Sequence, residues 1–183
     1  KYMKEDPRIK LIKNRNNRKV LYSKSIAALN AKGKYIFPFD QDDILIRDDV
    51  FDMLYYQAEN NNLDLLQFRD IIKNQLYFNK RERVNIKLKH MLKYKETHLK
   101  FQPELKDTLF IKDNNYILWG SLIKIDLYKK AIYTMWPIII NYQLTFFEDH
   151  TLTVLIVIYA KKYKYLNNFC LIHLAHKKSA SSS

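Results

Sequence analysis

Three carboxylates fall within four positions of the sequence, at Asp40, Asp42 and Asp43. Carboxylates this close repel one another and raise each other's pKa, so such a cluster is most stable where a cation neutralises it. The apolar stretch Lys34–Phe39 before them is typical of a β-strand, and open α/β sheets bind ligands at the carboxyl ends of their strands. The pattern therefore favours a divalent-metal site suited to a diphosphate. The same residue types also form turns and cap helices, which is the simpler alternative.

A second group of acids, Asp48, Asp49 and Asp52, has a structural interpretation. These residues lie at the start of a segment whose apolar side chains recur at helical spacing. Side-chain oxygens and negative charge are favoured at the amino terminus of a helix. We therefore expect this group to cap a helix, and we leave it outside the candidate site.

The apolar periodicity predicts the scaffold that must position the acids. The amino-terminal part alternates a strand at Ile9–Ile12, a helix at about Ser23–Ala31, a strand at Lys34–Phe39, a helix after Asp48 and a strand at Leu63–Ile72. Gly33 fits the position just after a helix, where the residue often takes a left-handed backbone conformation. Pro38 implies a bulge or an unpaired position, because proline cannot donate to a ladder. The alternation predicts an α/β sheet with parallel neighbours.

The rest of the chain holds fewer signals. Residues 73–118 show weak periodicity, with a lysine-rich helical stretch near residues 86–100. Later segments fit a helix or strand-to-helix turn after Trp119-Gly120-Ser121, a helix over Thr151–Lys162, and a strand pair or extended segment over Tyr163–Leu174. We expect one domain over residues 1–176, followed by a polar tail at 177–183.

Composition restricts the partners and the compartment. The formal net charge of +13 over 183 residues favours an anionic partner: nucleic acid, a phospholipid surface or a phosphorylated small molecule. Cys170 is the only cysteine, which excludes an internal disulfide and a cysteine-rich zinc site and fits a reducing, cytoplasmic compartment. The longest apolar run, Leu152–Ala160, is too short to cross a bilayer. The amino terminus opens on charged, non-initiating sequence without an apolar signal region, so we expect the true start upstream.

An ordered set of segments resembles family 2 glycosyltransferases of the GT-A fold. The set comprises Asn17–Ile26, Leu29–Ile36, Asp40–Asp43, Trp119-Gly120 with the following Leu122–Lys124, and Glu148-Asp149. The resemblance extends over most of residues 8–176. It implies an α/β fold with a Rossmann-like mixed sheet flanked by helices. The family's first strand, and the next strand with its nucleobase-contacting acid, would lie before residue 1, so the resemblance also implies amino-terminal truncation.

The resemblance implies roles for the acids. Asp40 and Asp42 match the family's Asp-x-Asp motif, which binds Mg²⁺ or Mn²⁺ on the donor diphosphate, and Asp43 matches its acidic extension. Asp149 matches the general base that takes the proton of the acceptor hydroxyl, while Glu148 would orient a backbone amide or contact the acceptor. The implied reaction is metal-dependent transfer of a hexose from a nucleotide-diphosphosugar, with inversion. Without the resemblance, Glu148-Asp149 is typical of a helix-capping pair.

Further candidates each have a functional and a structural interpretation. Lys24 lies where the family often has a basic residue, and it would face phosphate or else be a solvated helix lysine. Trp119, with Gly120 beside it, would form a platform for a sugar ring or belong to the core. His173 would bind the metal or the diphosphate, or it is a surface or core histidine.

Three positions depart from the family's pattern. Lys19 stands where relatives tend to have Gly, Ser121 where Lys is common, and Cys170 near a usual Gly. Each departure could alter a turn or a contact, so a degenerate, non-catalytic module that only binds ligand is an alternative.

Two alternatives come from other classes of protein. A basic nucleic-acid-binding domain ranks well below a transferase, because the lysines are spread along the whole chain without a binding signature. A two-metal phosphodiesterase could use the same acids. For the transferase we expect a nucleotide-diphosphosugar donor and a carbohydrate, lipid-linked or protein acceptor. The positive charge adds the hypothesis of peripheral contact with an anionic membrane.

Overall fold

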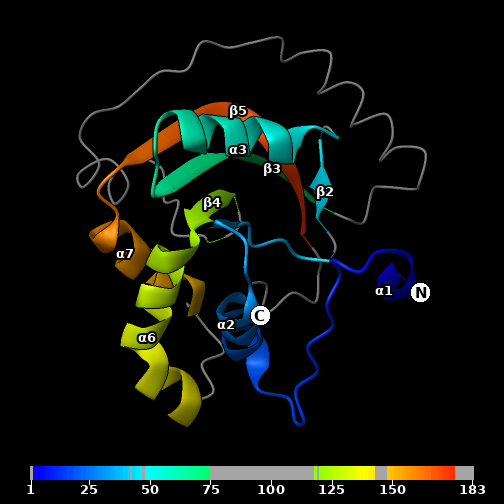
Figure 1. Ribbon diagram of the computed structural model, residues 1–183, viewed down its shortest axis with the longest axis vertical. Helices are drawn as coiled ribbons and strands as arrows, with labels where there is room; N and C mark the ends of the chain where they lie inside the picture. The colour runs from blue at the N-terminus through cyan, green and yellow to red at the C-terminus, as the bar shows by residue number, and fades with distance from the viewer. Residues whose placement is uncertain are drawn as a thin grey trace.

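The computed structural model describes residues 2–41, 43–46, 48–74, 118, 120–142 and 148–175. The elements in chain order are α1 (Tyr2–Glu5), α2 (Lys19–Asn30), β1 (Tyr35–Ile36), β2 (Ile44–Leu45), α3 (Val50–Asn60), β3 (Leu65–Asn74), β4 (Ser121–Lys124), α6 (Ile125–Asn141), α7 (Glu148–Tyr159) and β5 (Tyr163–Ala175). Most of these elements are labelled in Figure 1.

The described strands form one mixed sheet in the order β1-β4-β3-β5-β2. Only β3 and β5 pair in parallel, whereas β1–β4, β3–β4 and β2–β5 are antiparallel. The α/β class is confirmed, but the expectation of parallel neighbours holds for one pair only, because β4 lies between β1 and β3. Both of those strands run antiparallel to β4, so β1, β3 and β5 share one direction.

Helices cover both faces of the sheet. Figure 1 shows α3 on one side and α2, α6 and α7 on the other. Two apolar clusters result. One gathers side chains of α2, α6 and α7 around buried residues such as Ala131, Ile132 and Leu152. The other packs Val50, Leu54 and Ala58 of α3, which recur at helical spacing, on the opposite face.

One carboxylate ties the starts of several elements together. Asp64, just before β3, accepts backbone hydrogen bonds at Oδ2 from Lys161 and Lys162, at 3.0 and 3.1 Å, and its Oδ1 lies 3.4 Å from Nζ of Lys124. Partial burial of Asp64 opposes its ionisation, but these donors outweigh burial and hold the pKa of the carboxyl below its usual value. The charged form of Asp64 therefore stabilises the fold.

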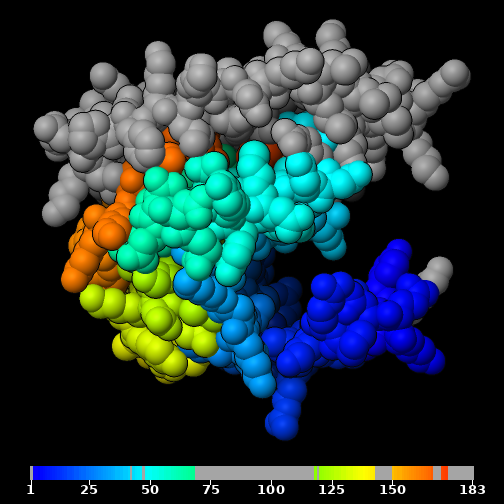
Figure 2. All heavy atoms as spheres, turned by 45° about the horizontal axis from the view of Figure 1, so that its top comes forward, coloured from blue at the N-terminus to red at the C-terminus, as the bar shows by residue number. Residues whose placement is uncertain are grey.

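The segment Ile9–Ile12 is not a strand, contrary to the sequence prediction. Ile9, Leu11 and Ile12 are 45%, 71% and 42% exposed. The alternation of apolar residues is present, but no described strand lies beside it to pair with. Figure 2 shows this dark-blue amino-terminal segment beside the body of the molecule rather than within it.

Gly33 does not take the left-handed backbone that its position after the helix suggested. Helix α2 ends at Asn30, and Ala31 leaves in an extended conformation with φ −70° and ψ 144°. Of the two glycines only Gly120 has a positive φ, at 82°. A Cβ added at Gly33 would make a tight contact, at 3.3 Å, with the carbonyl oxygen of Tyr35.

Other predicted elements are confirmed with shifted bounds. The strand expected at 34–39 pairs only at Tyr35–Ile36, so Pro38 lies outside the ladder, as its chemistry requires. Asp49 takes the N-cap position of α3, but without a side-chain capping hydrogen bond. The residues after Gly120 form the strand-to-helix turn from β4 to α6. The segment Tyr163–Leu174, expected as a strand pair or an extended segment, belongs to one long strand, β5.

Two expected elements, the helix near residues 86–100 and the tail at 177–183, lie outside the described residues. Within the part of the chain that the structure describes, no helix is long and apolar enough to cross a membrane.

Candidate active site

Asp40 and Asp43 lie at the two ends of a short turn, residues 40–43, which we call the acid turn. The backbone N–H of Asp43 donates to the carbonyl oxygen of Asp40 at 3.1 Å and closes it. Strand β2 follows at once and pairs with β5, with Ile44 opposite Ile172. The acid turn is therefore anchored on both sides, by β1 before it and by β2 after it. Asp43 is buried, with 8% exposure, and Asp42 lies outside the described residues.

Lys24 and Asp40, both predicted from the sequence, lie together. Nζ of Lys24, on α2, is 3.2 Å from Oδ1 of Asp40, and their side chains are 19% and 34% exposed. The orientation of α2 fixes this pair, since Leu21, Ser25 and Ala28 are buried on its inner face. The alternative of a merely solvated helix lysine is wrong for Lys24.

Helix α2 begins with an unusual backbone conformation. Lys19, where the family tends to have Gly, has a φ of 64°. Its N–H donates to Oδ1 of Asn17 at 3.0 Å, and its carbonyl oxygen accepts from the Ser23 hydroxyl at 2.8 Å. Left-handed backbone is costly for a residue with a Cβ. Residue 19 thus has a backbone conformation that favours glycine, but the residue there is lysine.

A groove of about 370 Å³ opens beside the ion pair. It is lined by α2, by the chain through β1 to the acid turn, and by one residue of α6. The lining residues are Lys24, Ala27, Ala28, Ala31, Tyr35, Ile36, Phe37, Pro38, Phe39 and Tyr128. Ala27 and Ala28 of α2, and Ala31 just after it, are small, which leaves room for a ligand next to the acid turn.

An aromatic cluster supports the acid turn from the α3 side. Phe37 stacks on Phe68 of β3 at 5.5 Å between ring centroids, meets Phe51 of α3 edge-on at 5.2 Å, and lies 6.0 Å from Phe39. Sequence reasoning missed this cluster, although aromatic residues alternate at positions 35, 37 and 39, which predicts one shared face. Its effect is to fix the backbone directly before Asp40.

Gly120 connects to that cluster through its backbone. Its carbonyl oxygen accepts a hydrogen bond from the N–H of Phe68 at 3.0 Å, and an added Cβ would lie 3.5 Å from the carbonyl oxygen of Phe68. Its φ of 82° explains why glycine is needed here. The described structure thus gives Gly120 a backbone role. Trp119 lies outside the described residues.

The topology brings the remaining candidates toward the same end of the sheet. Glu148 and Asp149 are the first residues of α7, which connects through residues 160–162 to β5. Because this connection is short, α7 runs back against the direction of β5, over about 18 Å. Its start therefore lies toward the end at which β1, β3 and β5 finish, where the acid turn is also found. The side chains of Glu148 and Asp149 are outside the described part, so their roles stay predictions.

His173 follows the residue that pairs with β2. One position beyond the Ile44–Ile172 pair, the antiparallel register sets the backbone of His173 opposite Asp43. Its side chain is outside the described part, so the predicted metal or diphosphate contact is untested.

The described acids of the acid turn have the chemistry that a hard divalent cation requires, but they do not by themselves form a complete site. Carboxylate oxygens are the ligands that Mg²⁺ and Mn²⁺ prefer, and the Lys24 ammonium already lies as a cation on Asp40. Within the described ranges, no three His, Cys, Asp or Glu side chains gather closely enough to hold a metal. A complete set would need Asp42 or His173, both predicted ligands beyond the described side chains.

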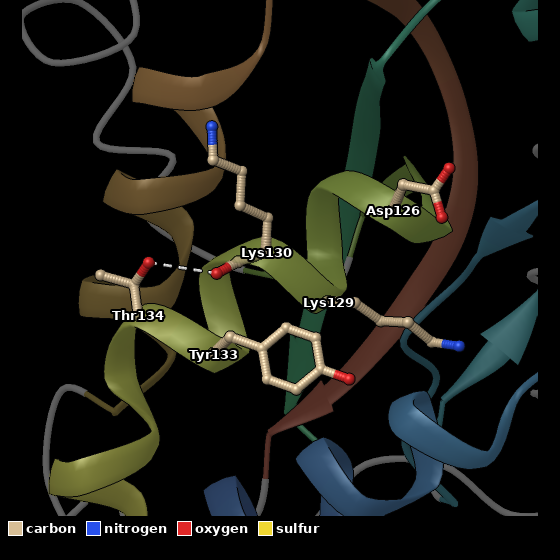
Figure 3. Close-up of a pocket in the computed structure, with 5 residues that line it drawn as sticks. All are labelled: Asp126, Lys129, Lys130, Tyr133 and Thr134. Carbon is tan, nitrogen blue, oxygen red and sulfur yellow. Dashed lines mark hydrogen bonds between the residues drawn. The ribbon is translucent and has the colours of Figure 1, made fainter.

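A second depression, of about 510 Å³, lies on the outside of α6. Figure 3 shows its lining residues Asp126, Lys129, Lys130, Tyr133 and Thr134, all on this helix. The two lysines point in different directions, and both have partners: Nζ of Lys129 donates to the carbonyl oxygen of Ala31, and Lys130 lies over the Tyr159 ring. These charges do not converge on one ligand, so the groove beside the acid turn is the better candidate.

Comparison with known proteins identifies the family and agrees with the fold. The model of the family "Glycosyl transferase family 2" matches residues 1–131. The chain therefore belongs to glycosyl transferase family 2. The match includes Lys24, the acid turn and Gly120, whereas Glu148, Asp149 and His173 lie beyond it.

Solved structures of S. aureus TarS 1-349 share the fold. The complex with UDP-GlcNAc superposes with a TM-score of 0.56 at 15% identity, over 87% of this chain and 40% of that chain. The complex with UDP gives 0.54 at 14% identity, over 84% and 39%. The chain thus spans about two fifths of the length of these TarS structures. At this identity the likeness concerns the fold alone, and it confirms the GT-A-like α/β class. No curated protein sequence matches this chain significantly.

Proposed function

We propose that this chain forms part of a glycosyltransferase that moves a hexose from a nucleotide-diphosphosugar to an acceptor hydroxyl. The observation that carries the proposal is the ion pair of Lys24 with Asp40 of the acid turn, beside a groove of about 370 Å³, in a chain that belongs to glycosyl transferase family 2. Lys24 and Asp40 supply a cation and a carboxylate, the two kinds of group that handle a metal-bound diphosphate. TarS, of related fold, binds UDP-GlcNAc and UDP, which makes uridine diphosphate donors the first to test.

In this proposal the acid turn holds Mg²⁺ or Mn²⁺ through Asp40 and Asp42, with Asp43 beside them and His173 as a further ligand. When bound, the cation would neutralise negative charge that builds on the departing nucleoside diphosphate. The anchoring of the acid turn by β1 and β2 supports this role, because preorganised ligands need little rearrangement on binding.

Asp149 serves as the general base in the proposed reaction, and Glu148 orients the acceptor or a neighbouring amide. The acceptor oxygen attacks the anomeric carbon, and the bond from that carbon to the donor phosphate oxygen breaks. The acceptor proton passes to the Asp149 carboxylate, and the nucleoside diphosphate leaves with the bonding electron pair. Direct displacement of this kind inverts the anomeric configuration. The position of Asp149 in the first turn of α7, toward the acid-turn end of the sheet, supports this assignment.

A transfer assay tests the proposal. The chain is incubated with UDP-sugars, Mn²⁺ and saccharide acceptors, and both the release of UDP and the anomeric configuration of the product are measured. We expect inverted product, and a loss of about 10²–10⁴-fold in Asp149→Asn with UDP binding retained. A retained anomeric configuration would contradict the mechanism, and an unimpaired Asp149→Asn would contradict the assignment of the base.

A further inference from the structure

The Lys24–Asp40 ion pair places one cation where the proposed function requires another. Nζ of Lys24 lies 3.2 Å from Oδ1 of Asp40, and neither side chain is more than about a third exposed, at 19% and 34%. An ammonium at that distance occupies a lone pair of a carboxylate oxygen that would otherwise bind a metal. A divalent cation must therefore displace Lys24 from Oδ1 or share Asp40 with it, against the repulsion of like charges.

Lys24 has room to leave Asp40. Lysine carries a compact charge on a flexible four-carbon stem. The next lining residues along the chain are small: Ala27 and Ala28 on the same helix, and Ala31 just after it. The groove lined by these residues adjoins Asp40, so the ammonium can swing into it without disturbing α2. A diphosphate bound in the groove would offer it new anionic partners.

We propose that Lys24 is an exchangeable cation: it neutralises Asp40 in the empty site, and a metal–diphosphate complex displaces it from the carboxylate onto a phosphate oxygen. This inference rests on the proposed function and adds how Lys24 couples the binding of the metal to the binding of the nucleotide. Metal alone binds weakly, because it must break the ion pair of Lys24 with Asp40. Metal and nucleotide together bind cooperatively, because a phosphate oxygen of the nucleotide accepts the displaced ammonium.

The test measures Mn²⁺ binding rather than turnover. Free Mn²⁺ is followed by electron paramagnetic resonance during titration of the full chain, with and without saturating UDP, in wild type, Lys24→Met and Lys129→Met. Lys129 is a matched control: it also loses one positive charge, but its Nζ donates to the carbonyl oxygen of Ala31 at 3.2 Å. Thermal unfolding of both variants verifies that they are folded.

We expect Lys24→Met to bind Mn²⁺ alone about threefold to fivefold more tightly than wild type, the range that loss of one partly exposed ion pair gives. The enhancement of Mn²⁺ binding by UDP should fall by at least as much. Lys129→Met should behave like wild type in both titrations.

Two results would overturn the inference. If UDP enhances Mn²⁺ binding equally in wild type and Lys24→Met, the proposed function stands and the exchange is wrong. If neither protein binds Mn²⁺ with or without UDP, the proposed function fails, and the exchange fails with it.

Discussion

Replacing Lys19 by glycine should stabilise the protein, although it deletes a side chain. Lys19 has a φ of 64°, a conformation that costs an L-residue roughly 1–2 kcal/mol and glycine almost nothing. Glycine loses more backbone freedom on folding, which offsets about 0.5–1 kcal/mol of that gain. The expected net effect is about 0.5–1 kcal/mol of added stability. For a domain of 150–250 residues this raises the melting temperature by about 1–4 °C.

The matched control is Lys19→Ala, which removes the lysine side chain but keeps the Cβ that causes the strain. The hydrogen bonds to Asn17 and Ser23 use only backbone atoms of residue 19, so both variants retain them. Urea unfolding followed by circular dichroism should place Lys19→Gly above wild type and Lys19→Ala near or below it. A glycine variant no more stable than the alanine variant would refute the reasoning from the backbone angle.

Two further substitutions test the backbone and charge arguments. Gly120→Ala should lower the free energy of unfolding by about 1–2 kcal/mol, because the φ of 82° at this position suits glycine alone. Gly33 has no positive φ, so Gly33→Ala should stay within about 1 kcal/mol of wild type. Equal losses of stability in urea unfolding would contradict this contrast. Asp64→Ala should cost about 2 kcal/mol at neutral pH, since it removes the acceptor of two backbone N–H groups and a partner of Lys124. The depressed pKa of Asp64 adds stability above about pH 4 that is lost as pH falls through the folded-state pKa. The gap between wild type and Asp64→Ala in unfolding free energy should therefore be constant above about pH 4 and shrink below it, and a gap that widens in acid would contradict the sign.

The sequence predicted those parts of the fold that depend on local pattern. Helix α3 and strand β3 follow from apolar periodicity alone. The segment 9–12 has the pattern of a strand but no described partner, and pairing depends on a neighbour that no local pattern contains. The position of β4 between β1 and β3 could not be predicted either, because it depends on pairing between residues far apart in the chain.

The candidate site shows the same division. The acid turn was predictable, because three carboxylates in four positions need a special setting. The ion pair of Lys24 with Asp40 was not, since it depends on how α2 packs against the end of β1. Lys19 is intermediate: its departure from the family's Gly was visible in the sequence, but its positive φ was not.

The most direct test of the central claim is UDP binding at the acid turn, measured by isothermal titration calorimetry with and without Mn²⁺. Wild type is compared with Asp40→Asn and Asp42→Asn, and with Asp126→Asn as a control acid on the outside of α6. We predict Mn²⁺-dependent binding that both acid-turn variants lose and the control keeps. UDP binding that is indifferent to Mn²⁺ and to both acid-turn variants would contradict the assignment of the donor site.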